Sequence, residues 1–307
     1  MRVLLTGANG FVGGHVMKEL VRRGHTVMGV AGPENLGGGL ISLDLRDAGL
    51  VGGVVGQFRP NSILHLAAQS SVGRSWDAPE DTFQVNVIGT INLWQAARKQ
   101  GVEHFIYVST AEVYQQGDRE SHLREDSAIR PTNPYGLSKC TAEQILDQLR
   151  VASAGSIRLT ILRPFNHTGP GQGSKFVVPA FAHQLAAIHR GAEPIIRVGN
   201  LDVFRDFLDV RDVTTAYCRV IALSTISGTY NICSGVPRTI QSILEDLSAV
   251  AAVGPITLVQ DRERMRPTDK GWLVGDPKHF YAATNWSPAI AWEDTLRAVW
   301  HEALDER

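Results

Sequence analysis

Short apolar runs alternate with helical periodicity along the first half of the chain. The run RVLLTG is followed by GGHVMKELVRRG, which carries apolar residues at helical spacing, and then by HTVMGV. This order of strand, helix and strand is typical of a parallel sheet. Three later runs are almost continuously apolar, as strands covered by helices on both faces must be: NSILHLAA, HFIYVST and LTILRPFN. With helices expected at 81–100 and 134–152, the pattern predicts an α/β fold with a doubly wound parallel sheet.

The residue composition of the chain changes after Pro164. The segment NHTGPGQGSKF is rich in glycine and proline, and helical periodicity returns near 178–190 and again at 292–304. A segment rich in glycine and proline between helical stretches predicts a lobe boundary. We expect residues 1–165 to form the first lobe, with a later crossing of the chain back to it near 205–233. Residues 166–307 are expected to form mainly a smaller α/β lobe.

Composition narrows the range of partners. The chain has 30 Lys and Arg against 31 Asp and Glu, so its bulk charge offers no field suited to nucleic acid or an anionic membrane. The cysteines, Cys140, Cys218 and Cys233, are odd in number and far apart, which favours a reducing cytoplasm over a disulfide framework. No run approaches the roughly 20 apolar residues that span a bilayer. The histidines lack ligand spacing, so we expect no metal.

A glycine turn joins the first expected strand to the first expected helix. The motif TGANGFVG places Gly7, Gly10 and Gly13 where backbone amides and a helix dipole can hold a pyrophosphate. The alternative is a plain turn with glycines that pack a helix on a strand. Because strand, helix and strand flank the motif in the required order, the turn favours a Rossmann-type dinucleotide site.

The sequence indicates the preferred coenzyme less clearly than it indicates the dinucleotide site. An acidic residue usually ends the second strand of NAD-specific folds, and Ala31 stands there instead. No Lys or Arg follows until Arg46, so a clamp for a 2'-phosphate is also missing. We expect the protein to accept both coenzymes, with a preference for NADP(H) over NAD(H). Asp44 and Leu45, at the end of the expected strand ISLDL, are placed to contact adenine, although a surface aspartate at a strand end is a real alternative.

Two side chains of NPYGLSK stand one helical turn apart. Pro134 suits a first helical position, so Tyr135 and Lys139 share one face. An ammonium beside a phenol lowers the tyrosine pKa and gives a proton donor for a carbonyl that receives hydride. Alone, the pair would be a solvated helix face. The run HFIYVST changes this, because it ends with Ser109 and Thr110 at the sheet edge where substrate would lie over the coenzyme.

The chain resembles the extended short-chain dehydrogenase/reductase family. The motifs TGANGFVG, the DL pair, HLAAQSSV, NVIGT, VSTAEVY, YGLSK and RPFN stand in that family's order. The resemblance implies Thr110, Tyr135 and Lys139 as catalytic residues, with Lys139 also binding the nicotinamide ribose. Together with the glycine turn it implies coenzyme contacts from Gly7, Gly10, Phe11, Val12, Gly13, Asp44, Leu45, Ala67, Ala68, Asn86, Tyr135, Lys139 and Phe165.

The second lobe resembles that of enzymes acting on nucleotide sugars. The resemblance implies substrate contacts from Ser109, Thr110, Asn166, Val178, Arg205 and Arg266. An arginine fork makes paired, charge-assisted hydrogen bonds to a pyrophosphate. Taken alone, each arginine would be an exposed salt bridge.

Within the family, NHTGPGQ, FVVPAFAHQLAAI and YNICSG are most similar to reductases of GDP-4-keto-6-deoxy-D-mannose. This similarity implies NAD(P)H-dependent reduction of the C4 ketone to GDP-D-rhamnose, in a homodimer. Glu112 keeps a GDP-mannose-type 4,6-dehydratase open as an alternative, since related dehydratases use a glutamate there, but Ala111 before it weakens that alternative. A 4-epimerase and a non-catalytic NAD(P)-sensing protein are the other candidates. Ala31 disfavours the epimerase, and the complete catalytic set disfavours the sensor.

Overall fold

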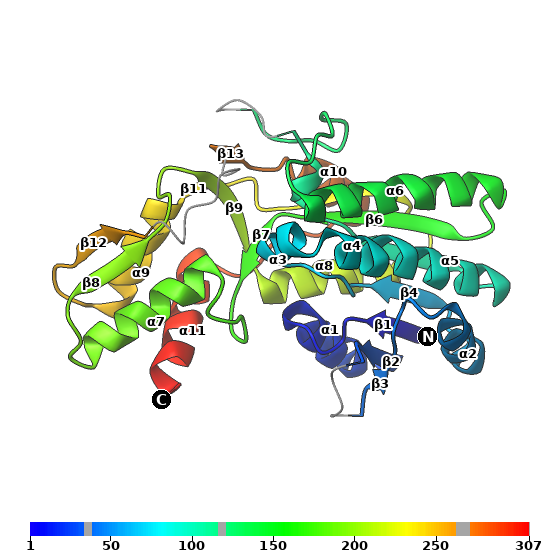
Figure 1. Ribbon diagram of the computed structural model, residues 1–307, viewed down its shortest axis with the longest axis horizontal. Coiled ribbons are helices and arrows are strands. Elements are labelled where there is room, and N and C mark those ends of the chain that lie inside the picture. The colour runs from blue at the N-terminus through cyan, green and yellow to red at the C-terminus, as the bar shows by residue number, and fades with distance from the viewer. Residues whose placement is uncertain (34–38, 116–120, 262–270, 307) are drawn as a thin grey trace.

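A seven-stranded parallel sheet is the frame of the larger lobe in this computed structural model, which describes residues 1–33, 39–115, 121–261 and 271–306 (Figure 1). The strand order is β10-β6-β5-β4-β1-β2-β3, and every neighbouring pair is parallel. The order reverses between β1 and β4, as in a doubly wound fold. The strands are β1 (Arg2–Thr6), β2 (Thr26–Ala31), β3 (Ile41–Ser42), β4 (Ser62–His65), β5 (His104–Val108), β6 (Arg158–Pro164) and β10 (Gly228–Ile232). The predicted fold class is confirmed.

Helices cover both faces of this sheet, which explains why its strands are apolar throughout. In β1, Val3 and Leu5 pack with the cluster that holds helices α1 and α8, whereas Leu4 packs with the cluster under α2, α5 and α6. Alternate side chains of a strand point to opposite faces, so both faces need apolar residues. The helices are α1 (Phe11–Arg22), α2 (Ala48–Phe58), α5 (Gly89–Lys99), α6 (Pro134–Ala152), α8 (Val210–Ala222) and α10 (Lys278–Thr284).

The helix expected at 81–100 is broken near its start. It consists of α4 (Pro79–Phe83), a π-helical turn at Gln84–Ile88 and then α5, and the short helix α3 (Val72–Asp77) precedes it. π-Helical turns inside helices are frequent at functional sites. The expected strand ISLDL is also shorter than predicted, because only Ile41–Ser42 pairs with β2. Asp44 and Leu45 therefore lie beyond the strand, in the turn that leads to α2.

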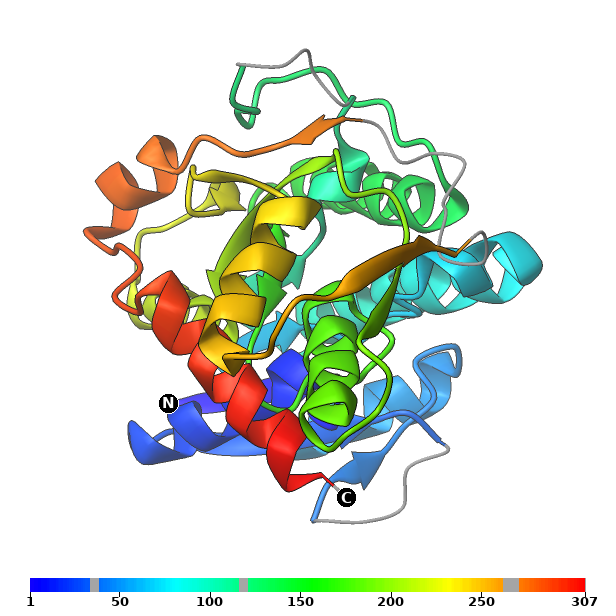
Figure 2. The same cartoon turned by 90° about the vertical axis from the view of Figure 1, so that its left-hand side faces the viewer.

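The smaller lobe packs three helices against short strands (Figures 1 and 2). Figure 2 shows α7 (Val177–His189), α9 (Ile240–Ala251) and α11 (Trp292–Asp305) side by side over one core. Strand β9 (Phe204–Asp209) lies between β11 (Pro237–Thr239) and β13 (Trp272–Leu273) and also pairs with β7 (Asn166–Thr168). A separate parallel pair is formed by β8 (Ile195–Val198) and β12 (Thr257–Gln260).

The chain returns to the larger lobe through α8 and β10, at 210–232. The strand before α8, β9, pairs within the smaller sheet, yet its Leu208 packs in the core of the larger lobe. Asp206 of β9 is fully buried, and its carboxylate accepts hydrogen bonds from the Ser234 amide and hydroxyl and from the Gly235 amide at 2.6–2.9 Å. These bonds attach the smaller sheet to the segment that follows β10.

Among the described residues, no helix combines the length and apolar character needed to span a bilayer.

Candidate active site

The glycine turn between β1 and α1 is closely packed against its neighbours. Gly7 has φ +73°, and a Cβ there would lie 2.8 Å from the amide nitrogen of Ala67, so only glycine suits the position. A Cβ on Gly13 would lie 2.0 Å from the Gly7 carbonyl oxygen. These contacts bring the turn, the start of α1 and the end of β4 together, with Ala67 and Ala68 at the same edge of the sheet.

The start of α1 has the features of an anion-binding site. Gly10 occupies the N-cap without a side-chain acceptor, and no acidic residue stands in the first turn. The first amides of a helix have no partner within it, so the amides of Phe11, Val12 and Gly13 can donate to a ligand, whereas the Gly14 amide already bonds to the Gly10 carbonyl. The donors here fit a dinucleotide pyrophosphate.

Asp44, which was expected to contact adenine, is bound by Arg46. Its guanidinium makes hydrogen bonds of 2.7–3.0 Å to Asp44, which lower the pKa of that carboxyl, and a third carboxylate oxygen on Asp81 lies 3.1 Å away. Ala31 ends β2 beside this pair and is buried. Arg46, the first cation after Ala31 in the sequence, is therefore engaged by two acidic residues.

The expected catalytic residues meet where β5 ends and α6 begins. Thr110 follows β5, its hydroxyl accepts a hydrogen bond from the Glu112 amide at 3.2 Å, and its side chain lies close enough to Tyr135 to lower the pKa of that phenol. Lys139 is one turn along α6, 2% exposed, with its Nζ 4.3 Å from the centroid of the Tyr107 ring. The hydroxyl of Ser109 is buried and has no hydrogen-bond partner in the described part of the chain. The structure thus brings together all four residues.

Glu112 belongs to the same group. Its carboxylate accepts a 3.0 Å hydrogen bond from Nδ2 of Asn133, whose Oδ1 caps α6 by accepting from the Gly136 amide at 2.7 Å. Asn133 therefore fixes both the start of the helix that carries Tyr135 and the direction of Glu112.

Burial shifts the pKa of both Tyr135 and Lys139. It raises the pKa of Tyr135 to about 12, against a lowering contribution from Thr110, and Glu112 adds to the rise. The expectation was that Lys139 lowers the tyrosine pKa towards neutrality, whereas here burial of the phenol has the largest effect and moves the pKa the other way. Burial also lowers the pKa of Lys139 to about 7, partly offset by Glu143. In this state Tyr135 keeps its proton at neutral pH.

The expected substrate residues have different surroundings. Asn166 is exposed at the start of β7, and Arg205 is 7% exposed on β9. Val178 is 1% exposed and packs in the core of the smaller lobe, which speaks against a substrate contact through its side chain. Phe165 is buried too, stacked on Tyr114. Arg266 lies outside the described residues.

Comparison with known proteins shows the family. The family model described as GDP-mannose 4,6 dehydratase matches residues 4–299. The chain is 34% identical to GDP-6-deoxy-D-mannose reductase of Pseudomonas aeruginosa over 97% of its length and 95% of that protein. It is 31% identical to GDP-6-deoxy-D-talose 4-dehydrogenase of Aggregatibacter actinomycetemcomitans, covering 90% of this chain and 89% of that one.

The chain belongs to the GDP-mannose 4,6-dehydratase family of extended short-chain dehydrogenases/reductases.

Solved structures agree with this membership. RMD from Pseudomonas aeruginosa, complexed with NADPH, has a TM-score of 0.88 and 32% identity and covers 100% of this chain and 99% of that one. The UDP-glucose 4-epimerase of Thermus thermophilus, in complex with NAD, has a TM-score of 0.87 and 29% identity, with both chains covered completely. The predicted family and the prediction of an NAD(P)-dependent oxidoreductase are confirmed.

A hydrogen-bonded chain beneath the site was not foreseen from the sequence. His65 is bonded to Thr6 through Nδ1 at 2.7 Å and to Thr90 through Nε2 at 2.9 Å, and burial lowers its pKa to about 3. Thr90 donates to the carbonyl of Asn86, and the Asn86 side chain donates to the Ser138 hydroxyl at 2.9 Å. The buried polar pattern in HLAA and NVIGT was the available signal. This series of hydrogen bonds connects Thr6, which precedes the glycine turn, with Ser138 of α6.

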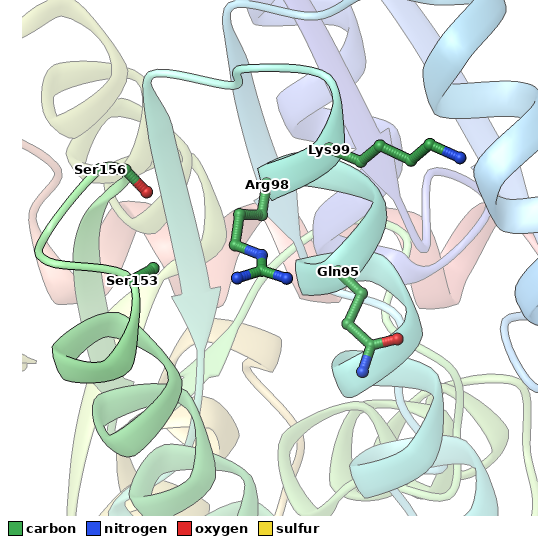
Figure 3. A pocket seen from close by; sticks show the side chains of 5 residues that line it. All are labelled: Gln95, Arg98, Lys99, Ser153 and Ser156. Atoms are coloured by element: carbon green, nitrogen blue, oxygen red, sulfur yellow. The ribbon is translucent and has the colours of Figure 1, made fainter.

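A surface depression of about 760 Å³ lies away from this site (Figure 3). It is found at the end of α5 and after α6, beside the amino ends of β5 and β6. Ligands of parallel sheets bind at the carboxyl ends of the strands, so this depression is not the coenzyme site. Its lining residues are Gln95, Arg98, Lys99, Ser153 and Ser156.

Lys139→Met is expected to stabilise the protein at pH 7. Below about pH 7 Lys139 is charged when folded and when unfolded, so folding bears the full cost of burying that charge. Between about 7 and the ordinary value of 10.5 only the unfolded chain is protonated, and the cost declines as the pH rises. Urea unfolding should therefore show a gain in stability for the variant that shrinks from pH 7 to pH 10.

The matched control is Lys99→Met, which removes the same charge from an exposed position. Equal pH dependence in both variants would contradict the burial cost assigned to Lys139.

Proposed function

We propose that the protein catalyses NAD(P)H-dependent reduction of the C4 ketone of GDP-4-keto-6-deoxy-D-mannose to GDP-D-rhamnose. The observation that carries the proposal is the grouping of Thr110, Tyr135 and the buried Lys139 where β5 ends and α6 begins, at the carboxyl edge of the sheet. Similarity to a GDP-6-deoxy-D-mannose reductase over 97% of the chain supports the substrate.

NADP(H) is the proposed coenzyme, with NAD(H) also accepted. The amides that open α1 receive its pyrophosphate, and Gly7, Gly10 and Gly13 let the backbone approach it. Bound coenzyme supplies the hydride for the ketone carbon. Proposed contacts to it come from Gly7, Gly10, Phe11, Val12, Gly13, Asp44, Leu45, Ala67, Ala68, Asn86, Tyr135, Lys139 and Phe165.

Tyr135 is the proposed proton donor. Its high pKa keeps the phenolic proton in place until negative charge develops on the substrate oxygen. Thr110 donates a hydrogen bond to the same oxygen and orients it, and the unpaired hydroxyl of Ser109 is available to the sugar. Lys139 binds the nicotinamide ribose. The ketone thus gains a hydride at carbon and a proton at oxygen.

The smaller lobe is proposed to hold the nucleotide sugar. Asn166 and Arg205 contact it, together with Arg266 and the backbone at Val178. Residues 1–165, with the crossing near 205–233, then bind the coenzyme, while residues 166–307 mainly bind the substrate. This division follows the two sheets.

Glu112 keeps the 4,6-dehydratase as the second candidate. Its carboxylate adjoins Tyr135 and is fixed by Asn133, as a base for water elimination would need to be. Human GDP-mannose 4,6 dehydratase is 25% identical over 98% of this chain, a weaker similarity than that to the reductase.

Purified protein should separate these two reactions. With GDP-4-keto-6-deoxy-D-mannose, we expect oxidation of NADPH at 340 nm and formation of GDP-D-rhamnose, identified by NMR. Without that substrate no oxidation should occur. Dehydration of GDP-mannose with no net use of NADPH would replace the proposal by the dehydratase.

Tyr135→Phe should lower kcat by about two to four orders of magnitude, the usual range for loss of a general acid. Affinity for NADPH, measured by fluorescence titration, should change little, because the ring and its packing remain. A variant with kcat near that of the wild type would remove Tyr135 from the proposed mechanism.

A homodimer formed through helices of the larger lobe is also proposed. Trp76 of α3, Ile88 of the π-helical turn and Leu137 of α6 are 40–56% exposed there. Light scattering should give twice the 33.5 kDa of one chain, and Leu137→Asp should shift the mass towards the monomer. Val151→Asp, near the far end of α6, is the matched control. A monomeric wild type would refute the dimer.

A further inference from the structure

Arg238 lies directly opposite Arg205 in the smaller lobe. Strands β9 and β11 are antiparallel, and their register pairs Arg238 with Arg205. Side chains at opposite positions of an antiparallel pair lie on the same face, with Cβ atoms about 4.5–5.5 Å apart. Arg205 was expected from the sequence to bind substrate, whereas Arg238 has no motif to mark it. The register therefore adds a second guanidinium beside the first.

An aromatic ring holds this second guanidinium. The Arg238 Cζ lies 4.6 Å from the centroid of Trp292, the first residue of α11. Trp292 is itself fixed, because its ring packs on Phe207 and its Nε1 donates to Asp246 at 3.0 Å. Stacking on a fixed aromatic face limits the orientation of an arginine fork.

Arg238 has hydrogen-bonding capacity that its described neighbours leave unused. Its Nε is buried without a partner, and within the described ranges it forms no ion pair. The closest acidic influences are Asp246 and Asp206. Asp246 accepts from Trp292, and Asp206 accepts from Ser234, Gly235 and Gly275. A buried donor without an acceptor is costly, so this arrangement favours a ligand that supplies one.

The same face belongs to the region where the nucleotide sugar is proposed to bind. Arg205 and Phe207 alternate along β9 on that face, and Phe207 shares a core with Val178 at the start of α7. Burial lowers the pKa of Arg238, yet a guanidinium stays protonated in proteins. An anion with two adjacent charged groups matches two neighbouring guanidinium groups, and the unused donors of Arg238 can reach one of its charges.

We propose that Arg238 binds the pyrophosphate of the nucleotide sugar together with Arg205, with Trp292 fixing the plane of its guanidinium. This inference rests on the proposed function, since it assigns a further binding residue to the same substrate. It makes Arg238 a residue that distinguishes nucleoside diphosphates from monophosphates, whatever the base.

The test is calorimetric titration of the full chain with GDP and GMP, and with UDP and UMP as a second pair. Arg238→Gln should weaken binding of the diphosphate about 10- to 100-fold, the loss that corresponds to a charge-assisted hydrogen bond. Binding of the monophosphate should fall less. Arg238→Lys should give a smaller loss for the diphosphate, since it keeps the charge but not the fork.

Arg197→Gln is the matched control, because it removes the same charge from an exposed position on β8 of the same lobe. It should bind both nucleotides as the wild type does. NADPH titration and thermal unfolding of each variant report whether the fold is intact, and Arg238→Lys carries the test if Arg238→Gln does not fold.

Equal losses for diphosphate and monophosphate, or no loss in either Arg238 variant, would overturn the inference. Turnover of the keto sugar by the wild type would then still support the reductase. Conversely, if the wild type binds GDP through Arg238 but does not reduce the keto sugar, the proposed function fails while the inference stands.

Discussion

The close contact between the first turn of α6 and the end of β5 is the constraint on which the site depends. A Cβ on Gly136 would lie 2.6 Å from the carbonyl oxygen of Glu112, so glycine permits the two segments to meet. Asn133 then bonds to both, capping the helix and holding Glu112. This contact brings Tyr135 of the helix close to Thr110, which follows the strand. Backbone packing therefore positions Tyr135, the proposed proton donor.

The same packing determines the protonation states of Tyr135 and Lys139. Burial favours the neutral forms of both Tyr135 and Lys139, so Tyr135 is neutral at pH 7 while Lys139 gains and loses its proton near that pH. The polar residues beneath them are neutral as well, since burial lowers the pKa of His65 to about 3. A buried ion pair of Arg163 and Glu143 lies behind Lys139, and Glu143 partly offsets the lowering of the Lys139 pKa.

Strand β9 serves both lobes through the alternation of its side chains. Asp206 points to the segment after β10 and fixes the smaller sheet to the larger lobe. Arg205, one residue earlier, points to the opposite face, where Arg238 lies across from it. A single strand thus ties the lobes together and places Arg205 on its other face, where the substrate is proposed to bind. The alternation of period two accounts for both tasks.

Local patterns in the sequence determined the sheet, the glycine turn and the spacing of Tyr135 and Lys139, because each depends on residues within one or two turns of chain. Helix α6 accordingly has the predicted bounds. Only the tertiary structure decided which distant segments meet. The register of β9 with β11, the burial of Val178 and the raised pKa of Tyr135 all depend on neighbours far along the chain. Desolvation and strand register are properties of the packed molecule, and no short stretch of sequence records them.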